Sequence, residues 1–244
     1  MRQANAGNAI VIGASSGIGR ELARVLSEHG YAVGIAARRV ELLSELQRQL
    51  PGPSFIRRID VSQTDEAMAS LRDWIAEMGG VDLIVVNAGV GLRNPQLEWY
   101  PEKTTIDVNV TGFTAMVNVA VNYFLERGSG HLVGVSSVAA ILGHGEVPAY
   151  GASKAYESSY LRSLRNRIDK LRKPITITTI EPGFVDTDMV RGRAVFWCAS
   201  PRKAATQIFH AIVRRRRHAY VTRRWRLIAW IMKAMPERLW SRIA

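Results

Sequence analysis

The sequence predicts an α/β domain built on a doubly wound parallel sheet. Short apolar runs alternate with longer segments of helical periodicity along most of the 244 residues, as parallel strands joined by helices do. The runs are continuously apolar, so we expect both faces of the sheet to be covered. A glycine-rich turn at 13–19 joins the first run to the first helix, which is the context of a dinucleotide site.

The first third of the chain shows the alternation most clearly. Its strands are runs of Ile, Val, Ala and Leu, whereas its helices repeat apolar residues every three to four positions. Gly30 ends the first helix because glycine readily adopts the left-handed conformation of a helix C-cap. The expected strands are 9–12, 31–37, 54–61 and 81–86, and the expected helices are 20–29, 41–50 and 64–78.

The rest of the chain continues the same pattern. A long helix carries Asn109 beside an apolar stripe, and Pro182-Gly183 follows a late strand. Residues 1–222 are therefore expected to form one domain, extended by a basic, amphipathic helical segment at 223–244. The expected strands are 131–136, 175–180 and 218–222, and the expected helices are 104–127, 150–172, 201–213 and 223–235.

Composition restricts the class of protein. Hydrophobic residues make up 47% of the chain, enough for a core of ordinary size. The single cysteine, Cys198, cannot form an internal disulfide, which favours a reducing compartment. The N-terminus is polar, and no apolar run approaches the about 20 residues that span a bilayer. We therefore expect a cytoplasmic protein.

The net charge of +12 is concentrated at the C-terminal end. Residues 201–244 hold 12 of the 33 Lys and Arg residues and one acidic residue, Glu237. A short basic helix that carries Trp suits an anionic membrane surface. The alternatives are a helix packed over a cleft or against a partner subunit, and nucleic acid, which no accompanying motif supports. The apolar face of this helix consists of Trp225, Ile228, Met232 and Met235.

Tyr150 and Lys154 are four residues apart, so on a helix they lie on one face. A phenol has a pKa of about 10, and an ammonium one turn away lowers it toward neutral pH. Ser137 ends an apolar run, where its hydroxyl would reach a substrate oxygen, and Ser136 is a rival for that role. Tyr and Lys at this spacing also occur on ordinary surface helices, so a catalytic role for the pair depends on the other motifs in the chain.

The second and third strands end in charged residues. Arg38-Arg39 follows the second strand, where an NAD site normally places an acid; a basic group there suits the 2′-phosphate of NADP. The alternative for Arg38-Arg39 is a basic turn that is exposed to solvent and binds no ligand. Asp60 lies at the end of the third strand, where its carboxylate would accept from an adenine amine.

Taken together, these motifs resemble the short-chain dehydrogenase/reductase family as far as about Val221. The resemblance implies a Rossmann-type fold and an enzyme that uses NADPH to interconvert a carbonyl and an alcohol on a small molecule. It also implies a homodimer or homotetramer, and no metal site. An apolar substrate is expected from the basic, Trp-bearing tail, since a membrane surface would bring lipophilic compounds to the cleft. The matching pieces are Gly13-Ala-Ser-Ser-Gly-Ile-Gly19, Asp60-Val61, Asn87-Ala88-Gly89, Asn109-Val-Thr-Gly, Ser137, Tyr150-x-x-x-Lys154 and Pro182-Gly183-x-Val-x-Thr187.

The resemblance also implies the residue roles. Tyr150 would be the general acid, and Lys154 would lower its pKa and hold the nicotinamide ribose. Ser137 would fix the substrate oxygen, and Asn109 would carry a water. Residues 184–199 would close over the substrate. The cofactor would be held by Gly13, Ser15, Ser16, Gly17, Ile18, Gly19, Arg38, Arg39, Asp60, Val61, Asn87, Ala88, Gly89, Tyr150, Lys154, Pro182, Gly183, Val185 and Thr187.

One residue departs from the pattern of NADP-preferring members. Ser16 stands where some of them have a basic residue, so the expected NADP preference rests on Arg38, together with Arg39. Two rival interpretations remain from other classes of protein. The first is a cofactor-sensing protein without turnover, and the second is a membrane-surface protein whose tail matters more than its chemistry.

Overall fold

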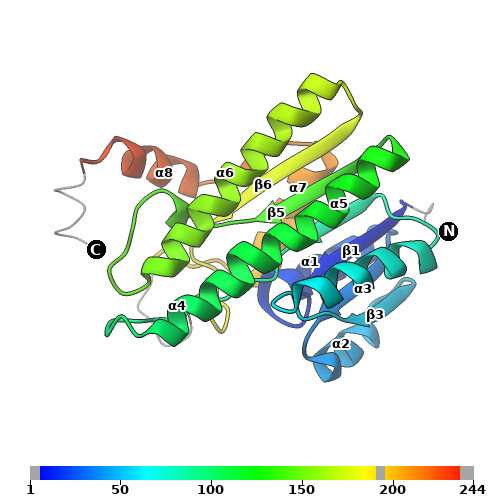
Figure 1. Ribbon diagram of the computed structural model, residues 1–244, viewed down its shortest axis with the longest axis horizontal. Helices are drawn as coiled ribbons and strands as arrows, with labels where there is room; N and C mark the ends of the chain where they lie inside the picture. Colours follow the sequence, from blue (N-terminus) through cyan, green and yellow to red (C-terminus); the bar gives the residue numbers. More distant parts are fainter. Residues whose placement is uncertain (1–5, 191–195, 237–244) are drawn as a thin grey trace.

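Parallel strands form one sheet at the centre of the protein (Figure 1). The computed structural model describes residues 6–190 and 196–236, and within them the sheet has seven strands in the order β3-β2-β1-β4-β5-β6-β7. The order reverses between β1 and β4, as in a doubly wound fold. The strands are β1 (Asn8–Ile12), β2 (Ala32–Ala37), β3 (Ser54–Arg58), β4 (Leu83–Val86), β5 (Gly130–Val135), β6 (Ile175–Pro182) and β7 (His218–Val221).

Helices cover both faces of the sheet and enclose two apolar layers. Figure 1 shows α3, α5 and α6 in front of the sheet and α1 and α7 behind it. Trp74, Phe113 and Leu161 belong to the front layer, and Leu22 and Ile208 to the rear layer. The bounds are α1 (Gly17–Glu28), α2 (Val40–Gln47), α3 (Thr64–Glu77), α5 (Phe113–Arg127), α6 (Pro148–Leu171) and α7 (Pro201–Val213).

These elements confirm the predicted fold class, and the ends of some elements differ. The third strand stops at Arg58 rather than at 61, because Asp60 and Ser62 enter a turn. In this turn the backbone N–H and the hydroxyl of Ser62 both donate to the Asp60 carboxylate. The helix that carries Tyr150 begins earlier, at Pro148, because proline is well suited to the first turn of a helix.

The predicted helix 104–127 is longer than expected and is interrupted. It starts as α4 (Trp99–Ile106), passes through a π-helical turn, η1 (Asp107–Gly112), and continues as α5. By length and composition the stretch Trp99–Arg127 is the one described helix that could cross a membrane. However, 61% of its apolar 18-residue segment is buried inside the protein. It is therefore a core helix.

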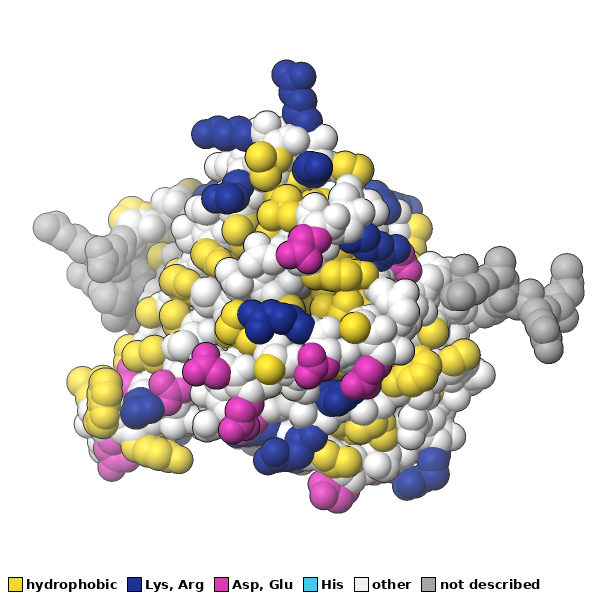
Figure 2. Space-filling model, turned by 45° about the vertical axis from the view of Figure 1, so that its right-hand side comes forward, with side chains coloured by type: hydrophobic (Ala, Val, Ile, Leu, Met, Phe, Trp, Pro, Cys, Tyr) yellow, Lys and Arg dark blue, Asp and Glu magenta, His cyan; other side chains and the backbone are white. Residues whose placement is uncertain are grey.

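Positive charge also gathers away from the tail. Figure 2 shows Lys and Arg side chains at the top of the molecule, where Figure 1 places the C-terminal end of α6. Acidic side chains lie mainly in the lower half of this face. The basic residues of the α6 end and the turn after it are Arg162, Arg165, Arg167, Lys170, Arg172 and Lys173.

The C-terminal segment forms α8 (Trp225–Ala234), which lies against β7. Trp225 is 3% exposed, and its ring centroid lies 5.4 Å from that of Phe184 and 5.3 Å from that of Phe196. Of the apolar face predicted from the sequence, Trp225 is therefore buried, and Ile228, Met232 and Met235 are half-buried. A second apolar group on α8 faces solvent: Leu227, Trp230 and Ile231 are 58%, 60% and 50% exposed. Residues 237–244 lie outside the described part.

Candidate active site

The residues predicted to carry the chemistry lie at the carboxyl ends of the strands. The glycine turn follows β1, Arg38 follows β2, Asn87 follows β4, Ser137 follows β5, and Pro182 ends β6. In an open α/β sheet, ligands bind at this edge, beside the point where the strand order reverses. That point lies between β1 and β4, so the fold brings these distant motifs to one site.

The glycine turn fits closely against the turn after β4. Gly13 has a φ of 91°, and a Cβ built on it would lie 2.5 Å from the backbone nitrogen of Ala88. Asn87 Nδ2 donates to the carbonyl oxygen of Gly13 (2.9 Å). Gly17 has a φ of 57°, and a Cβ there would lie 2.9 Å from Thr187 Cγ2. A side chain at either position would collide with these neighbours, so glycine permits the close approach of the segments.

The N-terminus of α1 has the properties of an anion site. Its N-cap, Ser16, makes no side-chain capping bond, and no acidic residue lies in the first turn. The backbone N–H groups and the positive end of the helix dipole are therefore available to a phosphate. A cavity of about 210 Å³ opens here. Its lining residues are Ser16, Gly17, Arg20, Glu21, Asp186, Thr187, Asp188 and Pro201. The glycine turn and the helix N-terminus thus fit a dinucleotide pyrophosphate, and Arg20 is the basic residue of a lining that also holds three carboxylates.

The two arginines after β2 differ in their contacts. Arg39 Nη2 donates to Ser15 Oγ and Ser16 Oγ, both at 2.9 Å. Arg38 is exposed, and it makes no hydrogen bond or ion pair with any residue in the described ranges. The guanidinium nearest the glycine turn is therefore that of Arg39, the residue to which sequence reasoning gave the smaller part.

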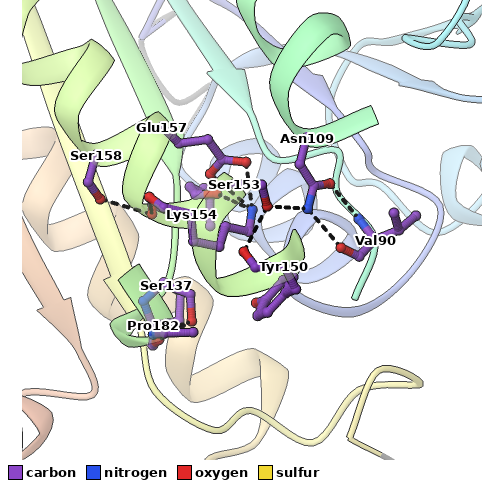
Figure 3. Close-up of polar contacts among 12 residues, drawn as sticks. Val90, Asn109, Ser137, Tyr150, Ser153, Lys154, Glu157, Ser158 and Pro182 are labelled. Carbon is purple, nitrogen blue, oxygen red and sulfur yellow. Dashed lines mark hydrogen bonds and ion pairs between the residues drawn. The ribbon is translucent and has the colours of Figure 1, made fainter. Parts of the chain in front are cut away.

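Tyr150 lies in the first turn of α6 and Lys154 in the next, as predicted (Figure 3). Lys154 Nζ lies 5.8 Å from the centroid of the Tyr150 ring. The lysine is 4% exposed, and its Nζ donates to both carboxylate oxygens of Glu157 (2.9 and 3.0 Å) and to the carbonyl oxygen of Val135 (3.3 Å). A buried ammonium thus stands directly behind the phenol.

Asn109 comes from the π turn and is fully buried. Its Oδ1 accepts from Val90 N (2.8 Å), and its Nδ2 donates to Val90 O (2.8 Å) and Ser153 Oγ (3.0 Å). Ser153 Oγ in turn donates to the carbonyl oxygen of Tyr150 (2.8 Å). Figure 3 shows this chain running from Val90 to the first turn of α6. Asn109 therefore fixes the position of the Tyr150 backbone.

The two candidate serines have different surroundings. Ser136 Oγ donates to the carbonyl oxygen of Lys154 (2.8 Å) and also lies 2.9 Å from Ser158 Oγ. Ser137 Oγ accepts from Ala139 N (3.1 Å) and donates to the carbonyl oxygen of Pro182 over a longer distance, 3.4 Å. Because Ser136 is engaged between β5 and α6, the geometry favours Ser137 as the hydroxyl that faces a substrate.

Sequence reasoning missed Glu157. Its side chain is 0% exposed, and burial raises its pKa to about 7, against the opposing effect of Lys154. A signal was present: Glu157 falls on the stripe of α6 that contains Lys154, Leu161 and Ile168, all of them buried. An acid on the inward face of an amphipathic helix needs a cation beside it.

Comparison with known proteins identifies the family. Residues 7–194 match the family model of short chain dehydrogenases. An uncharacterised oxidoreductase of Mycobacterium tuberculosis is 31% identical over 245 residues, which cover 96% of each chain. The family match includes the glycine turn, Asn109, Ser137, Tyr150 and Lys154.

Solved structures agree in fold. A short-chain dehydrogenase/reductase from Burkholderia phymatum in complex with NAD has a TM-score of 0.83 at 22% identity, covering 94% of this chain and 93% of its own. A variant of actinorhodin polyketide ketoreductase with NADPH has a TM-score of 0.74 at 28% identity, covering 84% and 89%. The chain therefore belongs to the short-chain dehydrogenase/reductase family and is an NAD(P)-dependent oxidoreductase.

Proposed function

We propose that this enzyme is an NADPH-dependent carbonyl reductase in which Tyr150 is the general acid. The observation that carries the proposal is the placement of Tyr150 and Lys154, with Ser137 and Asn109, at the sheet edge that also holds the glycine turn. NADPH supplies the hydride when bound. Tyr150 donates its phenolic proton to the carbonyl oxygen, toward which the hydroxyl of Ser137 directs a hydrogen bond.

The same edge would hold the cofactor. Residues 13–19 and the N-terminus of α1 would bind the pyrophosphate. The adenosine side would meet Asp60–Val61 and Asn87–Gly89, and the nicotinamide would meet Pro182, Gly183, Val185 and Thr187. Support comes from the close packing of Gly13 on Ala88 and of Gly17 on Thr187, which joins these segments into one continuous surface.

A preference for NADP over NAD is part of the proposal. No acid stands at the end of β2, and Arg38 and Arg39 follow it. The contacts from Arg39 to Ser15 and Ser16 place a guanidinium beside the glycine turn, where a 2′-phosphate would accept from it. Arg38, which is exposed, would supply the second charge.

We propose an apolar substrate. A Cβ built on Gly91 would lie 3.0 Å from Met189 Sδ and 3.3 Å from Tyr150 Cδ2. The thioether of Met189 and the ring of Tyr150 therefore lie on the same side of Gly91. Phe196 and Trp197, which are 55% and 43% exposed, follow in the segment proposed to close over the substrate. Aliphatic or aromatic ketones and aldehydes suit such surroundings.

A second candidate function concerns the solvent-facing side of α8, because of its composition. Leu227, Trp230 and Ile231 are exposed there, and the basic side chains of Arg226 and Lys233 are exposed on the same helix. We propose that this side contacts an anionic membrane surface while the protein remains cytoplasmic. The proposed division is a catalytic domain at 1–222 and a C-terminal extension at 223–244. A subunit contact within a homodimer or homotetramer is the competing use of this surface, since enzymes of this family are commonly oligomeric.

The experiment that tests the reductase assignment is a screen of the purified protein. Ketones and aldehydes of graded chain length are supplied, and the loss of NADPH absorbance is followed. We expect turnover that increases with apolar chain length. A complete lack of turnover across such a series would contradict the assignment.

A further inference from the structure

Glu157 and Lys154 form an ion pair inside the protein. Glu157 is 0% exposed, the lysine side chain is 5% exposed, and both carboxylate oxygens lie within 3.0 Å of Nζ. Among the described residues, the other hydrogen bond of Nζ goes to the carbonyl oxygen of Val135 (3.3 Å). Figure 3 shows the carboxylate reaching Nζ from the next turn of α6. The pair therefore fixes where the lysine head lies.

The fold alone does not require this acid. The other inward positions of the same stripe, Leu161 and Ile168, are core residues. A well-packed apolar residue in place of a buried ion pair is often neutral or stabilising, because two charges must otherwise lose their water. The placement of Glu157 is better explained by what it does to Lys154.

The electrostatic surroundings single out the same pair. In the described part of the chain, Lys154 is the one charged group that acts on the pKa of Glu157, which burial raises. Charged groups on the elements packed around α6 have partners of their own. They are Lys103 with Asp107 on α4 and η1, Glu102 on α4 with the side-chain amide of Asn94, Glu181 on β6 with His218 on β7, and His131 on β5 with the hydroxyl of Thr178.

We propose that Glu157 is a positioning residue whose carboxylate holds the Lys154 ammonium and balances its charge, so that the phenol of Tyr150 keeps its proton for reduction. The inference rests on the proposed function. An ammonium favours the phenolate of a neighbouring tyrosine, and a carboxylate on that ammonium offsets the effect. Removal of the carboxylate lets the full charge of Lys154 act on Tyr150. The phenol then loses its proton at a lower pH, which weakens reduction and favours alcohol oxidation.

The test uses Glu157→Gln, which keeps the shape, and Glu157→Leu, which fills the site with an apolar group. Asp169→Asn is the matched control, because Asp169 lies on α6 but is exposed and paired with Arg217. The pH profile of kcat/KM for reduction is measured for all three and for the wild type. We expect the alkaline limb to move down by about one pH unit in both Glu157 variants and to stay in place in Asp169→Asn. Unchanged limbs in folded, NADPH-binding Glu157 variants would overturn the proposal.

A second readout does not depend on activity. Burial raises the pKa of Glu157 from an ordinary 4.5 to about 7, so the folded protein takes up a proton between these values. Its contribution to stability is full below pH 4.5 and is lost as the pH rises through 7. Difference curves of unfolding midpoint against pH, wild type minus Glu157→Gln, should show this loss; a flat difference would refute the raised pKa of Glu157. If the loss appears but the wild type reduces no carbonyl, the reductase assignment fails, and the positioning role fails with it.

Discussion

The side-chain amide of Asn87 donates to the carbonyl oxygen of Gly13 over 2.9 Å and so joins two turns that are 74 residues apart in the sequence. The bond lies where the strand order reverses, between the glycine turn and the turn proposed to hold adenosine. The proposed cofactor surface therefore depends on how closely these two turns approach each other.

Gly13→Ala tests that approach. The new Cβ would lie 2.5 Å from Ala88 N, and the residue has a φ of 91°. Gly128 is the matched control: it has a φ of 84°, and a Cβ added there would meet no atom within 4 Å. Gly128→Ala should therefore cost only the roughly 1–2 kcal/mol of a left-handed backbone. Gly13→Ala should cost more and weaken NADPH binding, as measured by denaturant unfolding and cofactor titration. Equal effects of the two changes would contradict the close approach.

Tyr150→Phe tests the general acid. Turnover should fall by the roughly 10²–10⁴-fold that proton transfer contributes, while NADPH binding stays nearly intact. Tyr156→Phe is the control, because Tyr156 lies on the same helix and its hydroxyl contacts Thr114 rather than the site. Turnover is measured with the best carbonyl compound of the screen. A Tyr150→Phe enzyme that works at the wild-type rate would remove Tyr150 from its proposed role.

Arg38→Ala and Arg39→Ala test the cofactor preference separately. A charge-assisted hydrogen bond contributes about 1.5–3 kcal/mol, so loss of a phosphate contact should weaken NADPH binding tenfold or more and leave NADH binding unchanged. We expect the larger effect at Arg39, because its guanidinium already reaches Ser15 and Ser16. Titration of both cofactors decides this, and tighter binding of NADH than NADPH by the wild type would show that the preference is wrong.

His131 should make stability depend on pH in the direction opposite to Glu157. Burial lowers the pKa of His131 from 6.5 to about 4. Between these pH values the imidazole is therefore protonated in the unfolded chain and neutral in the folded protein. Its contribution is full above pH 6.5 and is lost as the pH falls toward 4. The wild type minus His131→Gln difference in unfolding free energy should therefore shrink on acidification. A difference that is constant between pH 7 and 4 would contradict the shift.

The outer side of α8 is tested by Trp230→Gln with Ile231→Gln. Truncation after Thr222 would also remove Trp225, which packs under Gly183 and Phe184, and would disturb the site. Exposed basic side chains near anionic lipid contribute about 1 kcal/mol each, and the apolar side chains add to this. The double variant should sediment less with anionic vesicles than the wild type. Trp99→Gln is the control, since Trp99 is 70% exposed on α4.

Two further results would decide between the uses of α8. Equal sedimentation of wild type and double variant would remove the membrane proposal. If the double variant instead changes the size of the oligomer in gel filtration, the surface is a subunit contact. Neutral vesicles distinguish charge from apolar insertion, because they keep only the second contribution.

The order of the elements was predictable because each carries its own local pattern. Continuous apolar strands and amphipathic helices can be recognised without knowing their neighbours, and the alternation then implies the parallel sheet. The glycine turn and the spacing of Tyr150 and Lys154 could be recognised in the same way.

The details that depend on distant contacts could not be predicted. The hydrogen bonds from Arg39 to Ser15 and Ser16 require β2 and the glycine turn to be side by side. The burial of Trp225 depends on its close packing against Gly183, where a side chain would collide with the indole ring. Glu157 is a mixed case, because its helical position indicated burial, whereas its partner became clear only when the direction of Lys154 was known.

The π turn that carries Asn109 has a consequence for insertions and deletions in this gene. Such a turn takes up one residue more than a regular helical turn, while the helices on either side keep their facing. Deletion of a single codon within Asp107–Gly112 would close the turn to a regular helix and remove the widened turn that carries Asn109. The amide of Asn109 would then leave Val90 and Ser153. An in-frame loss of one residue here should therefore be more harmful than most substitutions at the same positions.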